Sequence, residues 1–212
     1  MALNMEMPKN TGGTAEPQAS KDNAQLVANL HGSHYDAASR GRAFFASSAS
    51  GGIALIAPAT GGGHPTLWNP AGSRVNLNII RLEMGYVSGN NAPGAVEWAS
   101  NANAGVSHAT GGTIPTATKV NPEPCLIGTL ADSKAIWSPT TNTFTVAPAF
   151  LRSAGIGLFT GVAATATVPF SLRADYDGDF VVAPDVSISL CFQTTTTTAL
   201  FQITVTWEEV PI

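Results

Sequence analysis

The stretch GDFVVAPDVSISLCFQTTTTTALFQITVTWEEVPI, residues 178–212, decides the fold class. Apolar and polar residues alternate strictly in two parts of it. The apolar positions are Val186, Ile188, Leu190 and Phe192 in the first part and Phe201, Ile203, Val205 and Trp207 in the second. Side chains of a β-strand point to opposite faces in turn, so each part predicts a strand with one core face and one polar face. We expect the two strands to pair as an antiparallel hairpin through the five threonines at 194–198, and the second apolar set to close the core.

Short apolar runs extend this pattern upstream as far as residue 43, separated by clusters of Gly, Pro and Asn. The runs cover residues 43–49, 52–57, 74–87, 94–99, 125–130, 143–150, 165–173 and 179–183. In the longest, the apolar parity switches between Ile79 and Ile80, which fits a β-bulge or a strand buried on both faces in succession. Pro169 places its strand at an edge or at a bulge. Many short strands with turn signals between them, and no convincing long helix, predict one antiparallel β-sandwich domain over residues 41–212.

Residues 1–40 have no strand periodicity and predict an N-terminal arm. Ser20 can cap a short helix over 20–30, which would carry a thin apolar stripe. A helix of this length is marginal in water, so it needs a partner surface. The residues that we expect to make this contact are Leu26, Val27, Leu30 and Tyr35. The alternative is a disordered terminus.

The charge content indicates an assembled protein that binds no nucleic acid. Charged residues make up 11% of the chain, and the net charge is −4. An exposed surface normally recruits many charged residues, so a low charge content favours a surface partly covered by copies of the protein or by a lattice. Nucleic-acid binding requires a basic stripe, and the closest basic pair, Arg40 and Arg42, is too small.

Cysteine usage and hydropathy predict a protein made in a cytoplasm. Cys125 and Cys191 lie far apart and form no CxxC motif, which favours a reducing compartment. We find no signal-peptide run at the N-terminus and no apolar stretch near the ~20 residues of a membrane span. We therefore expect no membrane association.

The acidic stretch DYDGD, residues 175–179, is the best candidate for a cation site. An EF-hand loop needs Gly at its sixth position and Glu at its twelfth, whereas here Gly178 is fourth and Val186 is twelfth. A different cation site between subunits stays open as an alternative. We favour a solvated acidic turn in which Asp175, Asp177 and Asp179 bind no metal.

The histidines and cysteines do not form a recognisable catalytic or metal motif. His31 and His34 have zinc-like spacing but lack a second pair of ligands. His64 and His108 lie in loops, and neither is near a nucleophile motif. Cys191 shares the polar face of its strand with two serines, whereas Cys125 begins an apolar run and is expected in the core. We therefore predict no catalytic residue, no metal and no cofactor.

Residues 178–212 resemble the ending of jelly-roll virion proteins of tailed bacteriophages. The shared features are a short strand, a Pro-containing turn, an alternating strand, a Thr/Ala-rich loop and a final strand that closes in Trp207, Glu208 and Glu209. The Ala/Gly/Thr-rich body and the arm are similar to capsid decoration (cement) proteins of that kind. The resemblance implies an all-β, jelly-roll-like antiparallel β-sandwich with an extended N-terminal arm.

The resemblance also implies a function without catalysis. We expect a virion structural protein on the outer capsid surface, present as a homodimer or homotrimer, that binds the major capsid protein and stabilises the shell. The arm residues would then contact a neighbouring subunit or the capsid. The alternative is a head-fibre or receptor-binding module for cell-surface carbohydrate, with Trp68 and Trp137 in ligand-facing loops. A third hypothesis, a hydrolytic enzyme, lacks a paired-carboxylate or nucleophile–base constellation.

Overall fold

The computed structural model describes residues 34–61, 63–89, 94–114, 116–140, 142–157, 171–193 and 199–212, and the backbone of four short strands before them. The chain separates into two compact units, Met1–Tyr35 and Asp36–Ile212. The first unit holds two antiparallel pairs, β1 (Met7–Pro8) with β2 (Thr14–Ala15) and β3 (Gln18–Ala19) with β4 (Gln25–Leu26). Of the predicted helix over 20–30, only Gln25 and Leu26 are described, and they pair as a strand instead; Val27 and Leu30 lie outside the described residues.

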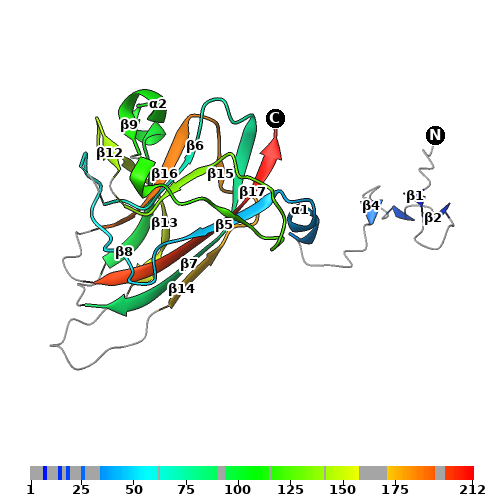
Figure 1. The fold of residues 1–212 in the computed structure, drawn as a ribbon, viewed down its shortest axis with the longest axis horizontal. Helices are drawn as coiled ribbons and strands as arrows, with labels where there is room; N and C mark the ends of the chain where they lie inside the picture. The colour runs from blue at the N-terminus through cyan, green and yellow to red at the C-terminus, as the bar shows by residue number, and fades with distance from the viewer. Residues whose placement is uncertain are drawn as a thin grey trace. The chain divides into compact units, whose positions relative to one another are not determined.

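Two antiparallel β-sheets form the second unit (Figure 1). The first sheet contains, in spatial order, β10 (Glu123–Pro124), β5 (Ala43–Ser47), β17 (Leu200–Pro211), β7 (Val75–Ser88) and β14 (Ser171–Asp175), with β15 (Val181–Val182) also paired to β7. The second sheet contains β11 (Ile136–Ser138), β6 (Thr66–Asn69), β16 (Val186–Phe192), β8 (Gly94–Ser100) and β13 (Ala149–Gly157).

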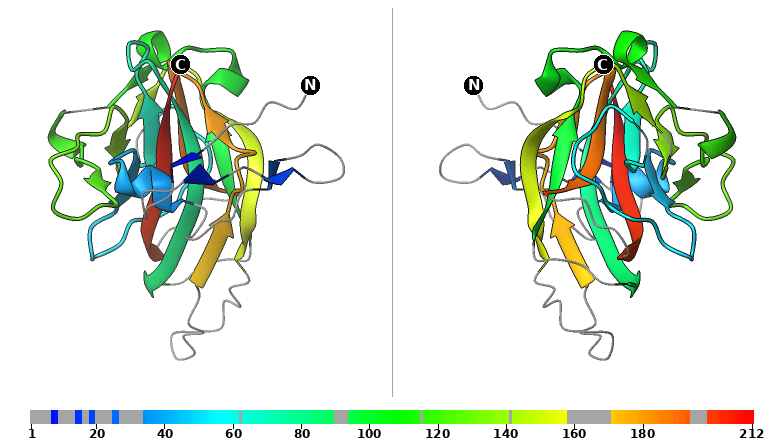
Figure 2. Two further views of the ribbon diagram at one scale, coloured as in Figure 1. Left: turned by 90° about the vertical axis from the view of Figure 1, so that its right-hand side faces the viewer. Right: turned by 90° about the vertical axis from the view of Figure 1, so that its left-hand side faces the viewer.

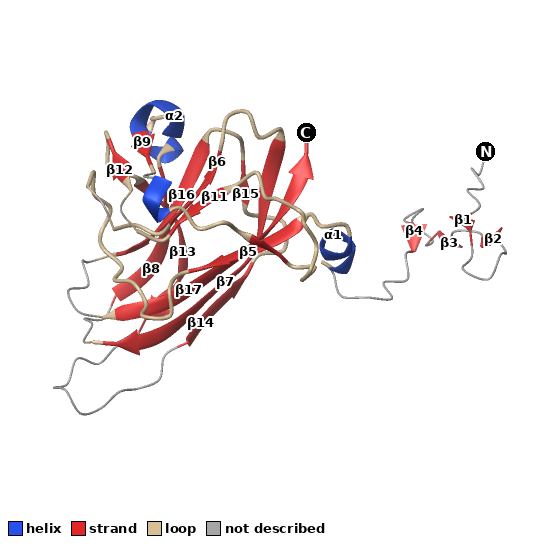
Figure 3. Cartoon of the chain, in the orientation of Figure 1, coloured by secondary structure: helices blue, strands red, loops and turns tan. Residues whose placement is uncertain are grey.

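Helices in the described part of the chain are single turns between strands (Figure 3). They are α1 (Tyr35–Ser39), α2 (His108–Gly111) and the 3-10 turns η1 (Ala102–Ala104) and η2 (Thr116–Thr118). The long connection from β8 to β13 carries three of these turns and a small ribbon in which β9 (Gly112–Thr113) pairs with β12 (Thr143–Phe144).

The order of strand pairing defines a jelly roll. In chain order the eight main strands are β5, β6, β7, β8, β13, β14, β16 and β17. The first pairs with the eighth, the second with the seventh, the third with the sixth and the fourth with the fifth, always antiparallel. This nested pairing is that of one long antiparallel ribbon rolled up into two sheets. Pairing of β17 with β7 completes the first sheet, and pairing of β16 with β8 completes the second. The predicted jelly-roll-like sandwich is confirmed.

The predicted hairpin between the last two strands is wrong. β16 pairs with β6 and β8, whereas β17 pairs with β5 and β7, so the two strands lie in different sheets. Alternation fixes which face of a strand is apolar, but not which strand lies beside it. The two apolar faces therefore meet across the core instead of sharing one sheet.

The core lies between the sheets, and the final strand contributes one of its three fully buried tryptophans. Phe201, Ile203, Val205 and Trp207 are all fully buried, as the alternation predicts. The Trp207 ring stacks on Phe44 of β5, with the ring centroids 6.4 Å apart.

The parity switch in β7 is a β-bulge, one of the two expected arrangements. Opposite β17, Arg81 pairs with Thr206 and Ile79 pairs with Trp207, which leaves Ile80 as the extra residue of a bulge. Both Ile79 and Ile80 are buried. The bulge therefore allows two consecutive apolar residues of one long strand to be buried.

The outer face of β16 is also buried, contrary to the prediction of a polar solvent face. Ser187, Ser189 and Cys191 alternate with core residues, yet all three are shielded from solvent. Two connections cover this face: the β5–β6 connection, residues 48–65, through His64, and the long β8–β13 connection, residues 101–148, through His108. We call the parts of these connections that lie over β16 the cover. A strand pattern does not reveal that distant loops will cover its polar face.

Removal of the Trp207 ring tests how far the core depends on the final strand. We expect Trp207→Ala to lower the free energy of unfolding by about 3–5 kcal/mol, because a fully buried ring leaves a cavity. Chemical denaturation measures the change. Gln202→Ala on the exposed face of the same strand is the control and should change it by less than about 0.5 kcal/mol. Equal effects of the two substitutions would contradict the placement of Trp207 in the core.

Candidate functional site

The acidic turn at 175–179 is neutralised by arginines. Asp175 Oδ1 accepts a hydrogen bond from Arg81 Nε at 2.6 Å, and its Oδ2 accepts one from Arg173 Nε at 2.8 Å. Asp179 forms an ion pair with Arg152 at 3.3 Å. The hydrogen bonds from Arg173 and Arg81 lower the pKa of Asp175. These carboxylates therefore hold cationic side chains of the same chain, and among the described residues no group of three or more His, Cys, Asp or Glu could bind a metal ion.

The two tryptophans proposed for carbohydrate binding do not lie on open loops. Trp137 lies in β11 and is fully buried, so its predicted ligand-facing position is wrong. Trp68 lies on β6 and is half-buried, with its ring centroid 4.4 Å from that of His108. Each tryptophan instead belongs to a short strand of the second sheet.

Cys191 and His64 form a buried contact that does not activate the thiol. Cys191 Sγ lies 3.5 Å from His64 Nδ1. Burial, followed by the charge of Glu97, raises the pKa of Cys191 to about 12, and burial lowers the pKa of His64. A thiolate–imidazolium pair needs the opposite shifts, so both groups are neutral at pH 7 and the contact is structural.

The remaining contacts under the cover are hydrogen bonds between small polar side chains. Thr66 Oγ1 lies 2.9 Å from Ser189 Oγ, and Asn142 Nδ2 donates to Thr66 Oγ1 at 2.7 Å. Asn142 also donates to the carbonyl of His64. The cover is therefore attached to β6 and β16 by hydrogen bonds of small polar side chains and also by the ring contacts of Trp68, His108 and Phe144.

The two most exposed large apolar side chains of the described residues, Leu130 and Ile127, lie on one loop after β10 together with Leu126. Leu126, Ile127 and Leu130 are 44%, 76% and 98% exposed. We call residues 126–130 the apolar loop. The sequence predicted a buried strand over 125–130, but β10 ends at Pro124, and Cys125 is only half-buried. Gly128 is the residue of this run that indicates a turn, because its φ of 91° lies in the left-handed region that favours glycine.

The apolar loop is held firmly at both ends. Before it, Cys125 N donates to the carbonyl of Ala43 on β5 at 2.8 Å. After it, Glu209 Oε1 accepts hydrogen bonds from Ser133 Oγ at 2.6 Å and from Lys134 N at 2.7 Å. Glu209 is only 7% exposed, so this carboxylate is a buried anchor.

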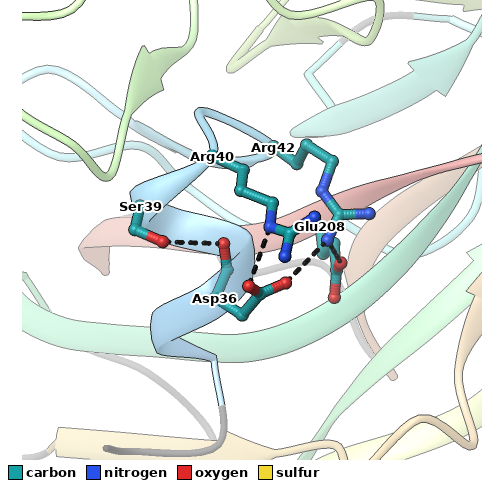
Figure 4. A network of polar contacts seen from close by, with 5 residues as sticks. All are labelled: Asp36, Ser39, Arg40, Arg42 and Glu208. Atoms are coloured by element: carbon teal, nitrogen blue, oxygen red, sulfur yellow. Dashed lines mark hydrogen bonds and ion pairs between the residues drawn. The ribbon is translucent and has the colours of Figure 1, made fainter. Parts of the chain in front are cut away.

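The neighbouring Glu208 secures α1 to the same sheet (Figure 4). Asp36 accepts hydrogen bonds from Arg40 Nε at 2.8 Å and from Arg42 Nη2 at 3.2 Å, and Ser39 Oγ donates to its carbonyl. Arg42 also pairs with Glu208 at 3.6 Å. The two glutamates thus bind different segments: Glu208 contacts the loop after α1, and Glu209 contacts the end of the apolar loop.

These two segments meet at the β10–β5 edge of the sandwich. A Cβ atom on Gly41 would lie 3.2 Å from Ala131 Cβ, so the turn after α1 touches the residue after the apolar loop. Both views of Figure 2 show α1 (blue) on the side of the sandwich opposite β13 (yellow). Tyr35, the first residue of α1, is exposed. Of the predicted contact residues, it is the one whose side chain the structure describes.

Comparison with known proteins gave no match: no family model fits the chain, and no curated protein or solved structure matched it significantly. In the described part of the chain, no helix is long and apolar enough to cross a membrane. The function is therefore inferred from the residues and their arrangement.

A pair of substitutions tests the different roles of the two glutamates. Glu209→Ala leaves the buried N–H of Ala135 and two partly buried donors without an acceptor, so we expect the free energy of unfolding to fall by about 1–3 kcal/mol. Glu208→Ala removes a surface ion pair and should cost less than about 1 kcal/mol. Denaturant unfolding of both variants measures the difference. A larger loss for Glu208→Ala would contradict the assignment of Glu209 as the anchor.

Proposed function

We propose that the protein is a virion structural protein that binds the outer surface of a phage capsid as an oligomer and stabilises the shell. The observation that carries this proposal is the apolar loop, a set of exposed large side chains on a firmly anchored segment. Contiguous exposed apolar surface is a common mark of protein–protein contact. We assign the apolar loop as the contact with a neighbouring subunit or with the major capsid protein.

The strength of this contact suits a repeating lattice. Full burial of a leucine or isoleucine side chain contributes about 1.5–3 kcal/mol to binding. Association costs at least several kcal/mol, because the partners lose translational and rotational freedom. Three side chains therefore give a weak single contact. A homodimer or homotrimer that engages several lattice sites at once gains avidity without any new contact.

The charge of the chain is consistent with the outer side of a capsid. The protein has 10 basic and 14 acidic residues in 212, and three of the arginines already pair with the acidic turn. Little positive charge remains for contact with packaged nucleic acid. The resemblance of residues 178–212 to phage jelly-roll proteins supports the same position, although a fold alone does not define a function.

The competing proposal, a carbohydrate-binding head fibre, has less support. It relied on two tryptophans in open loops, and Trp137 is fully buried while Trp68 stacks under His108. Copy number separates the two roles. Quantitative mass spectrometry of purified virions should find hundreds of copies per particle for a decoration protein and a few to a few dozen for a fibre. Absence from the particle would refute both virion roles.

Charged substitutions in the apolar loop test the proposed contact. We expect the double variant Ile127→Asp and Leu130→Asp to reduce binding to capsids at least about tenfold, because burial of either carboxylate is costly. Co-sedimentation with shells that lack the protein measures binding. Leu151→Asp, an exposed apolar position on β13 at the opposite edge, is the matched control and should bind normally. Equal binding by all three proteins would remove the apolar loop from the contact.

Deletion of residues 1–33 tests the predicted arm. The Asp36 network remains in this truncated chain, so we expect the sandwich to unfold at an unchanged denaturant concentration. Capsid binding should be lost, as the resemblance implies, while the oligomer persists. Full-strength binding by the truncated protein would show that the arm does not contact the capsid.

A further inference from the structure

A second candidate site lies away from the apolar loop, at the cover on the outer face of β16. Three hydrogen bonds join the segment 107–112 to Asp185 and Ser187, and Thr145 N also donates to its Gly111 carbonyl at 2.7 Å. Ser107 Oγ donates to the carboxylate of Asp185, and His108 N donates to the Asp185 carbonyl at 3.3 Å. The third joins His108 Nδ1 and Ser187 Oγ at 2.8 Å. His108 thus contributes to two of the three contacts.

The hydrogen bonds around Ser187 define which ring nitrogen of His108 carries the proton. Asn101 Nδ2 donates to the Val106 carbonyl, so Asn101 Oδ1 faces Ser187. That oxygen accepts from Ser187 N at 2.8 Å and from Ser187 Oγ at 2.9 Å. Since the Ser187 hydroxyl proton points to Asn101, Ser187 Oγ must accept from His108. Nδ1 therefore carries the hydrogen, and Nε2 presents a lone pair.

Nε2 of His108 is buried and has no hydrogen-bond partner among the described residues. The ring lies between aromatic side chains, with its centroid 4.4 Å from that of Trp68 and 5.8 Å from that of Phe144. A Cβ atom on Gly112 would lie 2.5 Å from the ring, so the segment is closely packed against it. A proton added to Nε2 would create a buried N–H without an acceptor and a charge without solvent.

The groups around His108 oppose protonation on balance. The carboxylate of Asp185 and the π face of Trp68 favour the cation, but burial has the larger effect and lowers the pKa of His108 to about 4. His64 lies on the far side of Phe144 and is neutral. β6, β9 and β12 carry no titratable residue, and β16 carries only Cys191, which is also neutral at pH 7.

We propose that His108 is an acid-sensitive latch, which holds the segment 107–112 over the outer face of β16 at neutral pH and releases it when Nε2 gains a proton. The hydrogen bonds beneath the cover are made by Ser, Thr and Asn side chains, which can bond to water instead once the segment lifts. Release of the segment leaves the apolar faces of β16 and β17 packed in the core. The opening is therefore local and does not require the sandwich to unfold.

The direction and range of the pH effect follow from the two protonation states. An exposed histidine has a pKa near 6.5, above the value of about 4 for the closed segment. A depressed histidine pKa stabilises the closed state fully above pH 6.5, and this contribution is lost as the pH falls toward 4. The opening equilibrium should rise about 20-fold between pH 7 and pH 5 and about 100-fold by pH 4.

Hydrogen exchange of the full chain tests the latch. Peptides that cover 101–113 should lose protection on acidification, after correction for intrinsic exchange rates, while peptides of β17 stay protected. His108→Gln should abolish this pH dependence. His64→Gln, which changes the other buried histidine, is the matched control and should retain it. A wild-type segment whose protection does not change with pH, or an equal acid response in His108→Gln, would overturn the proposal.

An NMR titration of His108 in the wild-type protein gives a second measurement that does not depend on any variant folding. The Cε1–Hε1 signal should titrate well below pH 6.5, and its chemical shifts should report the Nδ1–H tautomer at pH 7. A midpoint at the ordinary histidine value, or an Nε2–H tautomer, would refute the latch. None of these outcomes bears on capsid binding, so the latch and the proposed function can fail independently.

Discussion

The final strand, β17, is hydrogen-bonded on both sides, to β5 at the start of the domain and to β7 near its middle. This position makes one segment responsible for three parts of the structure. Trp207 points into the core, Glu208 pairs with Arg42 after α1, and Glu209 accepts the donors that end the apolar loop. The alternating direction of successive side chains allows neighbouring residues to serve the core and the surface at once. The proposed contact surface is thus assembled by the residues that complete the sheet.

This arrangement has a consequence for folding. The pairs of first with eighth and second with seventh strands join the two ends of the domain, and such non-local pairing is slow to form. The apolar loop comes from the middle of the chain, but its anchors Ala43 and Glu209 come from the two ends. The loop therefore gains its fixed position only when the ends have met. A partly folded chain would lack the ordered contact surface.

Local periodicity predicted the fold class and the buried face of β17 and indicated the bulge at Ile80, because each depends on side-chain direction along one strand. The same pattern could not show that β16 and β17 belong to opposite sheets, since that depends on partners far away in the chain. The apolar loop was mistaken for a core strand because composition does not distinguish an exposed apolar run from a buried one. The cover over β16 escaped prediction for a related reason: Ser187, which looks solvent-facing in sequence, is buried and hydrogen-bonded to Asn101 and His108 from a distant connection.

The two surfaces proposed for function differ in their chemistry and in their attachment. The apolar loop is tied to the first sheet through β5 and Glu209, and it displays side chains that gain by burial against a partner. The segment 107–112 is tied to the second sheet through Ser187 and Asp185, and it hides polar groups that lose little when water reaches them. Among the described residues, the hydrogen bonds that hold the apolar loop and those that hold the segment 107–112 have no residue in common. Because the two attachments share no residue, acid release of the segment 107–112 should leave the apolar contact surface intact, and capsid binding should not require that release.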